Sequence, residues 1–288
     1  MRNPRWPRKA APTRSQNPQV PAAGVLLLVA ALALALVLPA RNSLTANSRA
    51  GASVGPVAAS PIPAGTILPV KLQSGLSAED AATGQKVEAY IAQEVPLPNH
   101  GKIRLNSGVH GTVVSVNKSA DGNGVEVSLR FDQIEYDKQI IHVATSVRAL
   151  ASFEAVRAAR LPLGGADSGT PTGWANTVQI GGDIRYGDGG QVRNRSKENV
   201  GKGVSGGVLV HVSAPAGSEC EGPVNGDDRL QALWVFSADA CGVYDLKGVG
   251  IVHDGKTEPV GTITLRLEKE KMKLDAATGI LLRTVAVQ

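Results

Sequence analysis

Hydrophobic and polar residues alternate with a period of two in several short stretches of the chain. The alternation is clearest in KVEAYI (86–91) and VEVSLRF (125–131), and it recurs in GTVVSV (111–116) and QIIHVATSV (139–147). A period of two places one side of a β-strand on a core and the other side in water. Residues 61–150 are therefore predicted to form a first β domain of about six short strands, enough for a small barrel or sandwich.

Two hairpins are predicted within this first domain. The sequence NKSADGNG lies between the stretches 111–116 and 125–131. Its Asp, Asn and Gly residues tolerate the positive φ angles that tight turns between antiparallel strands require. A second turn is predicted at Asp137 and Lys138, where DQIEY meets QIIHVATSV.

A short helix and a Gly-rich linker are predicted over residues 151–173. In SFEAVRAARLP, Phe153 and Val156 fall at helical spacing, and Pro162 ends the run. The following LGGADSGTPTG has the composition of an interdomain linker. Residues 174–288 return to short apolar stretches between turns rich in Gly, Asp and Asn, which predicts a second β domain. The expected fold class is mostly β, with two small β domains that are barrel-like or sandwich-like.

The N-terminal part is of a different kind. An apolar stretch, AAGVLLLVAALALALVL, begins at Ala22 and ends at Leu38. It reaches the short end of the roughly 17–25 residues that span a bilayer, and it exceeds the roughly 7–15-residue core of a secretory signal. Residues 22–40 are therefore interpreted as an uncleaved membrane anchor, with a cleaved signal as the alternative. Both interpretations export residues 41–288, which begin with a flexible linker (41–60).

The charge of the chain agrees with this orientation. The 30 Lys and Arg exceed the 25 Asp and Glu by five, and the basic tail of residues 1–21 carries five cations and no acidic residue. Such a tail stays in the cytoplasm under the positive-inside rule. The rest of the chain is electrically balanced, and only 3% of all residues are aromatic. A nucleic-acid-binding surface needs a basic face with stacking aromatics, so nucleic acid is not an expected partner.

The predicted export determines how the two cysteines are interpreted. Cys220 and Cys241 form an even pair, and an oxidising compartment favours a disulfide between them. The cross-link would contribute roughly 3 kcal/mol by the chain-entropy estimate. A metal site is the alternative, but His211, Asp239 and His253 do not lie at the short spacing of zinc ligands.

The stretch GKGVSGG (201–207) matches two catalytic patterns at once. Gly201, Gly203 and Gly206 fit G-x-G-x-x-G, and Ser205 lies at the centre of G-x-S-x-G. Both patterns require a helix to follow, whereas VLVHVSA is typical of a strand. A turn between strands is therefore predicted. A Ser-His-Asp hydrolase built from Ser205 with His211, or with His253 and Asp239, is the least favoured interpretation.

The remaining candidate residues predict structure rather than chemistry. The carboxylates in GGDIRYGDGG and NGDD lack the spacing of a calcium loop and are expected in solvated turns; they are Asp183, Asp188, Asp227 and Asp228. Trp234 is predicted to be a core residue packed beside the disulfide, and Trp174 to be exposed. No catalytic, cofactor-binding or metal-binding residue is assigned.

The opening of the first β domain carries a family resemblance. IPAGTILPVKL, GQKVEAYI and SGVHGTVV occur in succession over residues 62–147. They resemble the opening strands and turn of the C-terminal barrel in TrbI-type scaffold proteins of conjugation and type IV secretion systems. The resemblance implies a cytoplasmic tail, one inner-membrane helix, a periplasmic linker and a β-barrel. IRLNSG replaces the family's L-I-P-x-G-S, and the cysteine-bearing domain lies where that barrel would continue.

These observations predict a non-enzymatic envelope protein that acts as a structural or interaction module, in the manner of a TrbI-like scaffold. Its expected partners are the inner membrane and envelope proteins, or further copies of itself. The alternative is a secreted or periplasmic binding module for glycan or another envelope component. An extracytoplasmic hydrolase is the third candidate.

Overall fold

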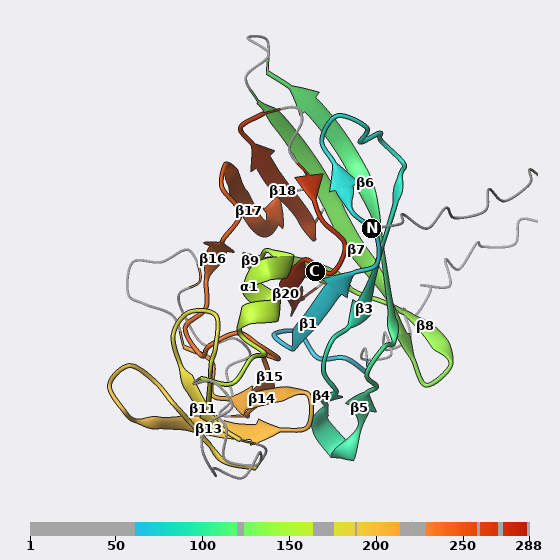
Figure 1. Ribbon diagram of the computed structural model, residues 1–288. Coiled ribbons are helices and arrows are strands. Elements are labelled where there is room, and N and C mark those ends of the chain that lie inside the picture. The colour runs from blue at the N-terminus through green and yellow to red at the C-terminus, as the bar shows by residue number, and fades with distance from the viewer. Residues whose placement is uncertain are drawn as a thin grey trace, which may run out of the picture. The chain divides into compact units, whose positions relative to one another are not determined.

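β-Strands make up most of the computed structural model, which describes residues 61–119, 124–163, 176–187, 189–213, 220, 229–257, 260–269 and 273–286 (Figure 1). The predicted anchor and linker lie outside the described residues. Within the described part, no helix is long and apolar enough to cross a membrane. The mostly β fold class is confirmed, and the N-terminal helix stays a prediction.

The larger sheet has ten strands. Their bounds are β1 (Ile67–Leu72), β3 (Lys86–Ile91), β6 (Gly108–Lys118), β7 (Val125–Tyr136), β8 (Gln139–His142), β9 (Ala144–Ala151), β16 (Gly242–Tyr244), β17 (Val249–Thr257), β18 (Thr262–Leu267) and β20 (Gly279–Val285). Neighbours follow the order β16-β9-β20-β1-β3-β6-β7-β18-β17, and β8 pairs with β7. Because β17 at one end contacts β9 and β16 at the other, the sheet is a nearly closed barrel.

A smaller six-stranded sheet runs in sequence order. It consists of β10 (Asn176–Val178), β11 (Ile184–Tyr186), β12 (Gln191–Arg193), β13 (Asn199–Val204), β14 (Gly207–Val210) and β15 (Gln231–Ala232). Two short pairs complete the strands: β4 (Val95–Pro96) with β5 (Lys102–Ile103), and β2 (Leu76–Ser77) with β19 (Lys273–Leu274). The 3-10 helix η1 (Pro98–His100) lies between β4 and β5, and α1 (Phe153–Ala158) follows β9.

Strand pairing does not follow the predicted division at residues 151–173. Strands β16, β17, β18 and β20 come from the predicted second domain, yet β16 and β20 pair with β9, β18 pairs with β7, and β20 pairs with β1. The barrel is therefore built from both predicted domains, and the smaller sheet is an insertion between β9 and β16. A period of two predicts that a stretch is a strand, but it does not predict which distant strand lies beside it.

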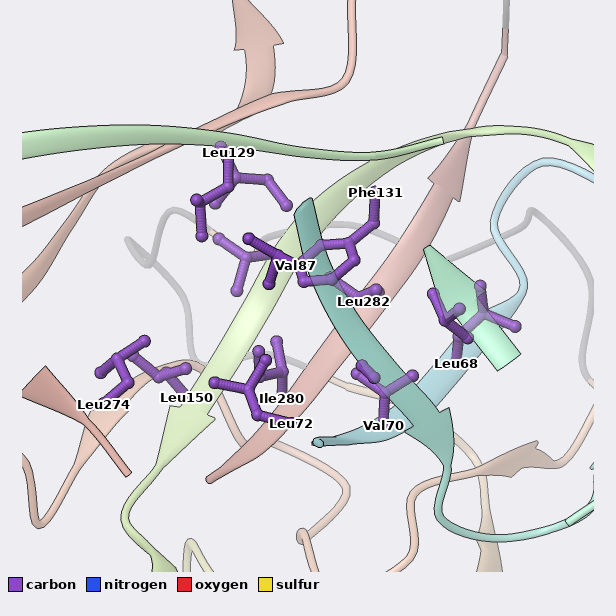
Figure 2. Close-up of a cluster of buried hydrophobic side chains, with 14 of the residues drawn as sticks. Leu68, Val70, Leu72, Val87, Leu129, Phe131, Leu150, Leu274, Ile280 and Leu282 are labelled. Carbon is purple, nitrogen blue, oxygen red and sulfur yellow. The ribbon is translucent and has the colours of Figure 1, made fainter. Parts of the chain in front are cut away.

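The barrel interior is filled by aliphatic side chains from most of its strands (Figure 2). Fully buried members include Leu68, Phe131, Leu150 and Leu282. The alternation in β3 and β7 places their apolar residues on this interior, as the sequence predicts. Burial of such side chains stabilises the fold by about 1.5–3 kcal/mol each.

Three neighbouring strands, β9, β20 and β1, are buried on both faces. On β20, Ile280 and Leu282 belong to the barrel core, whereas Leu281 belongs to a second core. That second core lies between the outer face of these strands, α1 and the smaller sheet, and it includes Trp234 and Phe236. The three strands therefore require a covering layer, and the inserted sheet provides it.

The predicted hairpins and the short helix are confirmed. β6 pairs with β7 in antiparallel register, and Asp137 and Lys138, with φ of 47° and 64°, form the turn from β7 to β8. Helix α1 begins after Ser152, whose side chain accepts the Ala155 N–H at 3.0 Å as an N-cap.

Pro69 lies inside a central strand, although proline is usually confined to edges. Its position explains why β1 tolerates it. Pairing of β1 with β3 begins only at Val70, so Pro69 lies beyond the last paired residue of β3. The N–H that proline lacks is therefore not needed for the β1–β3 ladder. The Pro69 carbonyl still accepts the Ala92 N–H at 2.8 Å.

The barrel core generates a stability prediction. Leu282→Ala removes a side chain that is 0% exposed, so the free energy of unfolding is expected to fall by about 2–5 kcal/mol. Leu161→Ala is the matched control because Leu161 is 54% exposed, and a change within about 0.5 kcal/mol is expected. Urea unfolding of the full chain measures both values, and equal losses would contradict the assignment of this core.

Candidate functional site

Among the described side chains of the hydrolase hypothesis, Ser205 and His211 are not brought together. Ser205 lies in the turn between β13 and β14, and His211 lies just beyond the other end of β14. Extended backbone rises about 3.3 Å per residue, so the two lie at least about 13 Å apart along the strand. Asp239 accepts the Ser237 hydroxyl at 2.9 Å. The side chain of His253 lies outside the described residues.

The glycines of GKGVSGG serve strand packing. Gly201 and Gly203 belong to β13, and β14 follows Gly206 with no helix between them, so the predicted turn is confirmed. A Cβ on Gly201 would lie 2.1 Å from the Leu209 carbonyl oxygen, and one on Gly203 would lie 2.3 Å from that of Gly187. Side chains at these positions would force the neighbouring backbones apart.

Asp183 corrects the prediction of solvated turn carboxylates. It is buried, and its carboxylate accepts the Ala238 N–H at 2.7 Å. Burial raises the pKa of Asp183 above its ordinary value, and the Ala238 hydrogen bond opposes this effect. Asp183 thus holds the loop before β16 against the smaller sheet. Asp188, Asp227 and Asp228 lie outside the described residues, among which no His, Cys, Asp or Glu group is arranged to hold a metal.

Gln93 joins the barrel to the inserted sheet. Its side chain is 1% exposed, and its amide donates to the Val208 carbonyl at 2.8 Å. Its carbonyl oxygen accepts the N–H groups of Val208 at 3.2 Å and Trp234 at 2.6 Å. A Cβ on Gly207 would lie 2.2 Å from this oxygen, so only glycine lets the β13–β14 hairpin approach so closely.

Trp234 is buried, as predicted, but its backbone is unusual. Its φ is 56°, which a bulky residue adopts only when the surrounding structure holds it there. The Gln93 hydrogen bond supplies part of that restraint. The ring packs close to Gly279 on β20, where a Cβ would lie 3.2 Å from it. Trp174 lies outside the described residues.

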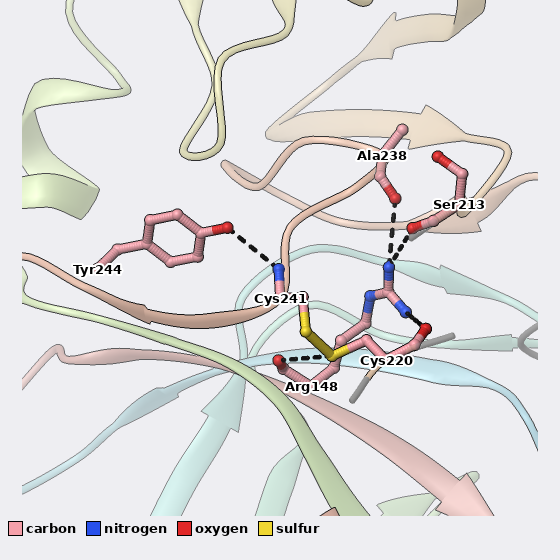
Figure 3. The surroundings of a disulfide bond; sticks show 6 residues. All are labelled: Arg148, Ser213, Cys220, Ala238, Cys241 and Tyr244. Carbon is pink, nitrogen blue, oxygen red and sulfur yellow. Dashed lines mark hydrogen bonds between the residues drawn. A yellow bond between two sulfur atoms is a disulfide. The ribbon is translucent and has the colours of Figure 1, made fainter. Parts of the chain in front are cut away.

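Arg148 and the disulfide form a second contact between the two sheets (Figure 3). Arg148 is the extra residue of a β-bulge in β9, because Leu282 pairs with Val147 and Leu281 pairs with Ala149. A bulge re-aims a side chain, and here the guanidinium contacts the carbonyl oxygens of Ser213, of Cys220 at 3.5 Å and of Ala238 at 3.4 Å. Burial, followed by the nearby charge of Arg283, lowers the pKa of Arg148 to about 10.

The predicted pairing of the cysteines is present in the structure. Cys220 and Cys241 are joined by a disulfide, and the Sγ of Cys220 lies 3.5 Å from the backbone oxygen of Arg148. The Cys241 N–H donates to the Tyr244 hydroxyl at 3.1 Å. The cross-link therefore lies directly beside the buried arginine.

No protein-family model, curated protein or solved structure matched this sequence. The resemblance to TrbI-type barrels consequently stays a prediction.

A surface cavity of about 880 Å³ opens beside the contact between Gln93 and the inserted sheet. One wall is the β13–β14 hairpin, and the other is the β4–η1–β5 segment. Its described lining includes the apolar Leu97, Leu105 and Leu209, and the Glu94–Lys102 ion pair of 2.9 Å. The hairpin belongs to the inserted sheet, and Gln93 lies in the segment that leads from β3 to β4. The shape of the cavity therefore depends on the contact that Gln93 makes with the hairpin residue Val208.

Sequence reasoning missed both Gln93 and Arg148. Arg148 is the single charge in the otherwise uncharged strand ATSVRALA, and this isolation is a usable signal for a buried cation. Gln93 lies next to Glu94 in the short connection between two apolar stretches, where polar residues are ordinary, and gives no comparable signal. Its role depends on residues more than a hundred positions away, with separations of 115 and 141.

Loss of the Gln93 side-chain amide tests the first contact. Gln93→Leu removes the oxygen that accepts the N–H groups of Val208 and Trp234, whereas the Val208 carbonyl still accepts the Leu233 N–H. The free energy of unfolding is expected to fall by about 2–4 kcal/mol. Gln73→Leu is the matched control at an exposed position. Urea unfolding measures both, and a loss for Gln93→Leu no greater than for the control would contradict the bridging role.

Asp183 generates a pH prediction. A carboxyl with a higher pKa in the folded state binds its proton more tightly when folded, so its contribution to stability is lost as pH rises from about 4 through the raised pKa. Asp183→Asn does not titrate. The free energy of unfolding of the native chain, relative to this variant, should therefore fall with rising pH. The fall is about 1.4 kcal/mol for each pH unit by which the folded-state pKa exceeds the ordinary value.

Unfolding in urea across pH 4–8 provides the measurement. Asp80→Asn, at an exposed site, is the control for the general effect of replacing an aspartate by asparagine. Parallel curves for the native chain and Asp183→Asn would contradict the effect of burial on this carboxyl.

Proposed function

We propose that this chain is a cell-envelope protein, exported by residues 22–40 and acting through binding rather than catalysis. The observation that carries the proposal is the Cys220–Cys241 disulfide at the contact between the two sheets. Disulfides persist in oxidising compartments and are rare where thiols are kept reduced. An exported location accords with both the cross-link and the uncharged stretch that follows the basic tail.

The hydrogen bonds of the buried polar side chains support the proposal that the chain is an interaction module. Gln93, Arg148 and Asp183 all bond to backbone groups that hold the two sheets together. These groups maintain a fixed surface at the place where the sheets meet. Such a rigid surface suits recognition of an envelope partner, or of a further copy of the chain.

A TrbI-like scaffold is the most specific form of this proposal. The nearly closed, barrel-like sheet supports it at the level of architecture alone. The alternative, a secreted or periplasmic module for glycan or another envelope component, shares the same exported location. A hydrolase remains the third candidate, and activity abolished by Ser205→Ala would favour it.

Localisation of the full-length chain tests the proposal. The protein is expected in the inner-membrane fraction, with both cysteines unreactive to a maleimide reagent until a reductant is added. A variant lacking residues 22–38 is the control and should remain in the cytosol with both thiols reactive. Recovery of the native chain from the cytosol with two free thiols would overturn the proposal.

Partner capture separates the two forms of the proposal. Cross-linking in native membranes followed by affinity purification should recover secretion-channel components if the chain is a scaffold. A glycan-binding module should instead show thermal stabilisation by purified envelope glycans, and retain it after deletion of residues 1–60. If a correctly exported protein recovers no channel components and is not stabilised by glycans, both forms of the proposal are contradicted.

A further inference from the structure

Arg148 occupies an unusual environment for an arginine. It is only 4% exposed, and no carboxylate lies within ion-pair distance of it among the described residues. Its Nε has no hydrogen-bond partner. The charge is therefore held chiefly by backbone carbonyl dipoles. A buried cation is strongly destabilising when its partners are lost, so the positions of those carbonyls matter.

The three carbonyl groups come from separate places along the chain. Ser213 follows β14, Ala238 precedes β16, and Cys220 lies between them in sequence. A covalent bond joins one of the three, Cys220, to Cys241. The next residue, Gly242, pairs with Ala149, the neighbour of Arg148 on β9.

This arrangement connects the disulfide to the arginine. The cross-link holds the Cys220 carbonyl close to the guanidinium, because Cys241 is fixed at the edge of β9 (Figure 3). In the opposite direction, the guanidinium holds the backbone of Cys220 near Cys241 even before the sulfurs are joined. Each contact reduces the conformational freedom that the other must restrict.

We propose that disulfide formation and the docking of the inserted sheet on Arg148 are thermodynamically coupled, so that each one favours the other. The cross-link forms by exchange with a small disulfide such as oxidised glutathione. One cysteine thiolate attacks the oxidant and releases one glutathione thiol, leaving a mixed disulfide. The second cysteine thiolate displaces the other glutathione, so two protein thiols are oxidised and one oxidant disulfide is reduced.

The coupling has a consequence for the cavity beside Gln93. Its hairpin wall belongs to the inserted sheet, so oxidation favours the fully assembled cavity. If the proposed export is correct, assembly is thereby favoured in the compartment where the chain operates. The coupling itself is a property of the purified protein, so its failure can be distinguished from a failure of the proposed location.

Redox titration of the purified full chain tests the coupling. Coupled equilibria are reciprocal, so removing the arginine must weaken the disulfide. In glutathione buffers, Arg148→Met should lower the ratio of disulfide to dithiol about tenfold or more relative to the native chain. Arg266→Met is the matched control, because Arg266 is an exposed arginine that pairs with Glu126 on the barrel. An unchanged ratio for Arg148→Met would overturn the proposal.

Hydrogen exchange of the native chain gives a second readout that needs no variant. After reduction, the amides of Trp234 and Ala238, which bond to Gln93 and Asp183, should exchange about tenfold faster or more. The amides between β3 and β6 should keep their protection, because those strands lie in the barrel. Unchanged exchange at Trp234 and Ala238 after reduction would overturn the proposal, even if Arg148→Met does not fold.

Discussion

The structure depends on three strands that are buried on both faces. β9, β20 and β1 each direct alternate side chains into the barrel and into a second core outside it. Such strands cannot face water on their outer side without exposing Ile67, Ala149 and Leu281. The inserted sheet and α1 cover that side, and this requirement explains why a β-rich insertion lies between β9 and β16.

Hydrophobic burial alone does not determine how the inserted sheet sits on the barrel. Apolar surfaces attract without direction, whereas Gln93 and Arg148 bond to particular backbone groups. A shifted sheet would leave these buried polar groups without partners, at a cost of about 1–3 kcal/mol for each. The polar contacts therefore select one arrangement, and the positive φ of Trp234 is sustained within it.

This arrangement gives the proposed function its physical basis. Ser205 and His211 of the hydrolase hypothesis are separated by the length of β14. Asp183, which the sequence predicted in a solvated turn, is instead buried and holds the loop before β16 against the smaller sheet. The resulting molecule has a rigid contact zone, closed by a disulfide, with a cavity at its edge. These features suit a protein that presents a stable surface to a partner, and the cross-link matches an exported chain.

The sequence alone was sufficient for the features that depend on neighbouring residues. Period-two alternation, turn residues such as Asp137 and Lys138, and the Ser152 cap act over a few positions, so the hairpins and α1 followed directly. The single cysteine pair left one intramolecular disulfide to form. Only the tertiary structure decided the rest. Strands β16, β17, β18 and β20 join the barrel, and Gln93 and Arg148 are buried between sheets. These outcomes depend on packing between residues far apart in the sequence, 141 positions for Gln93 with Trp234 and 218 for Thr66 with Thr284.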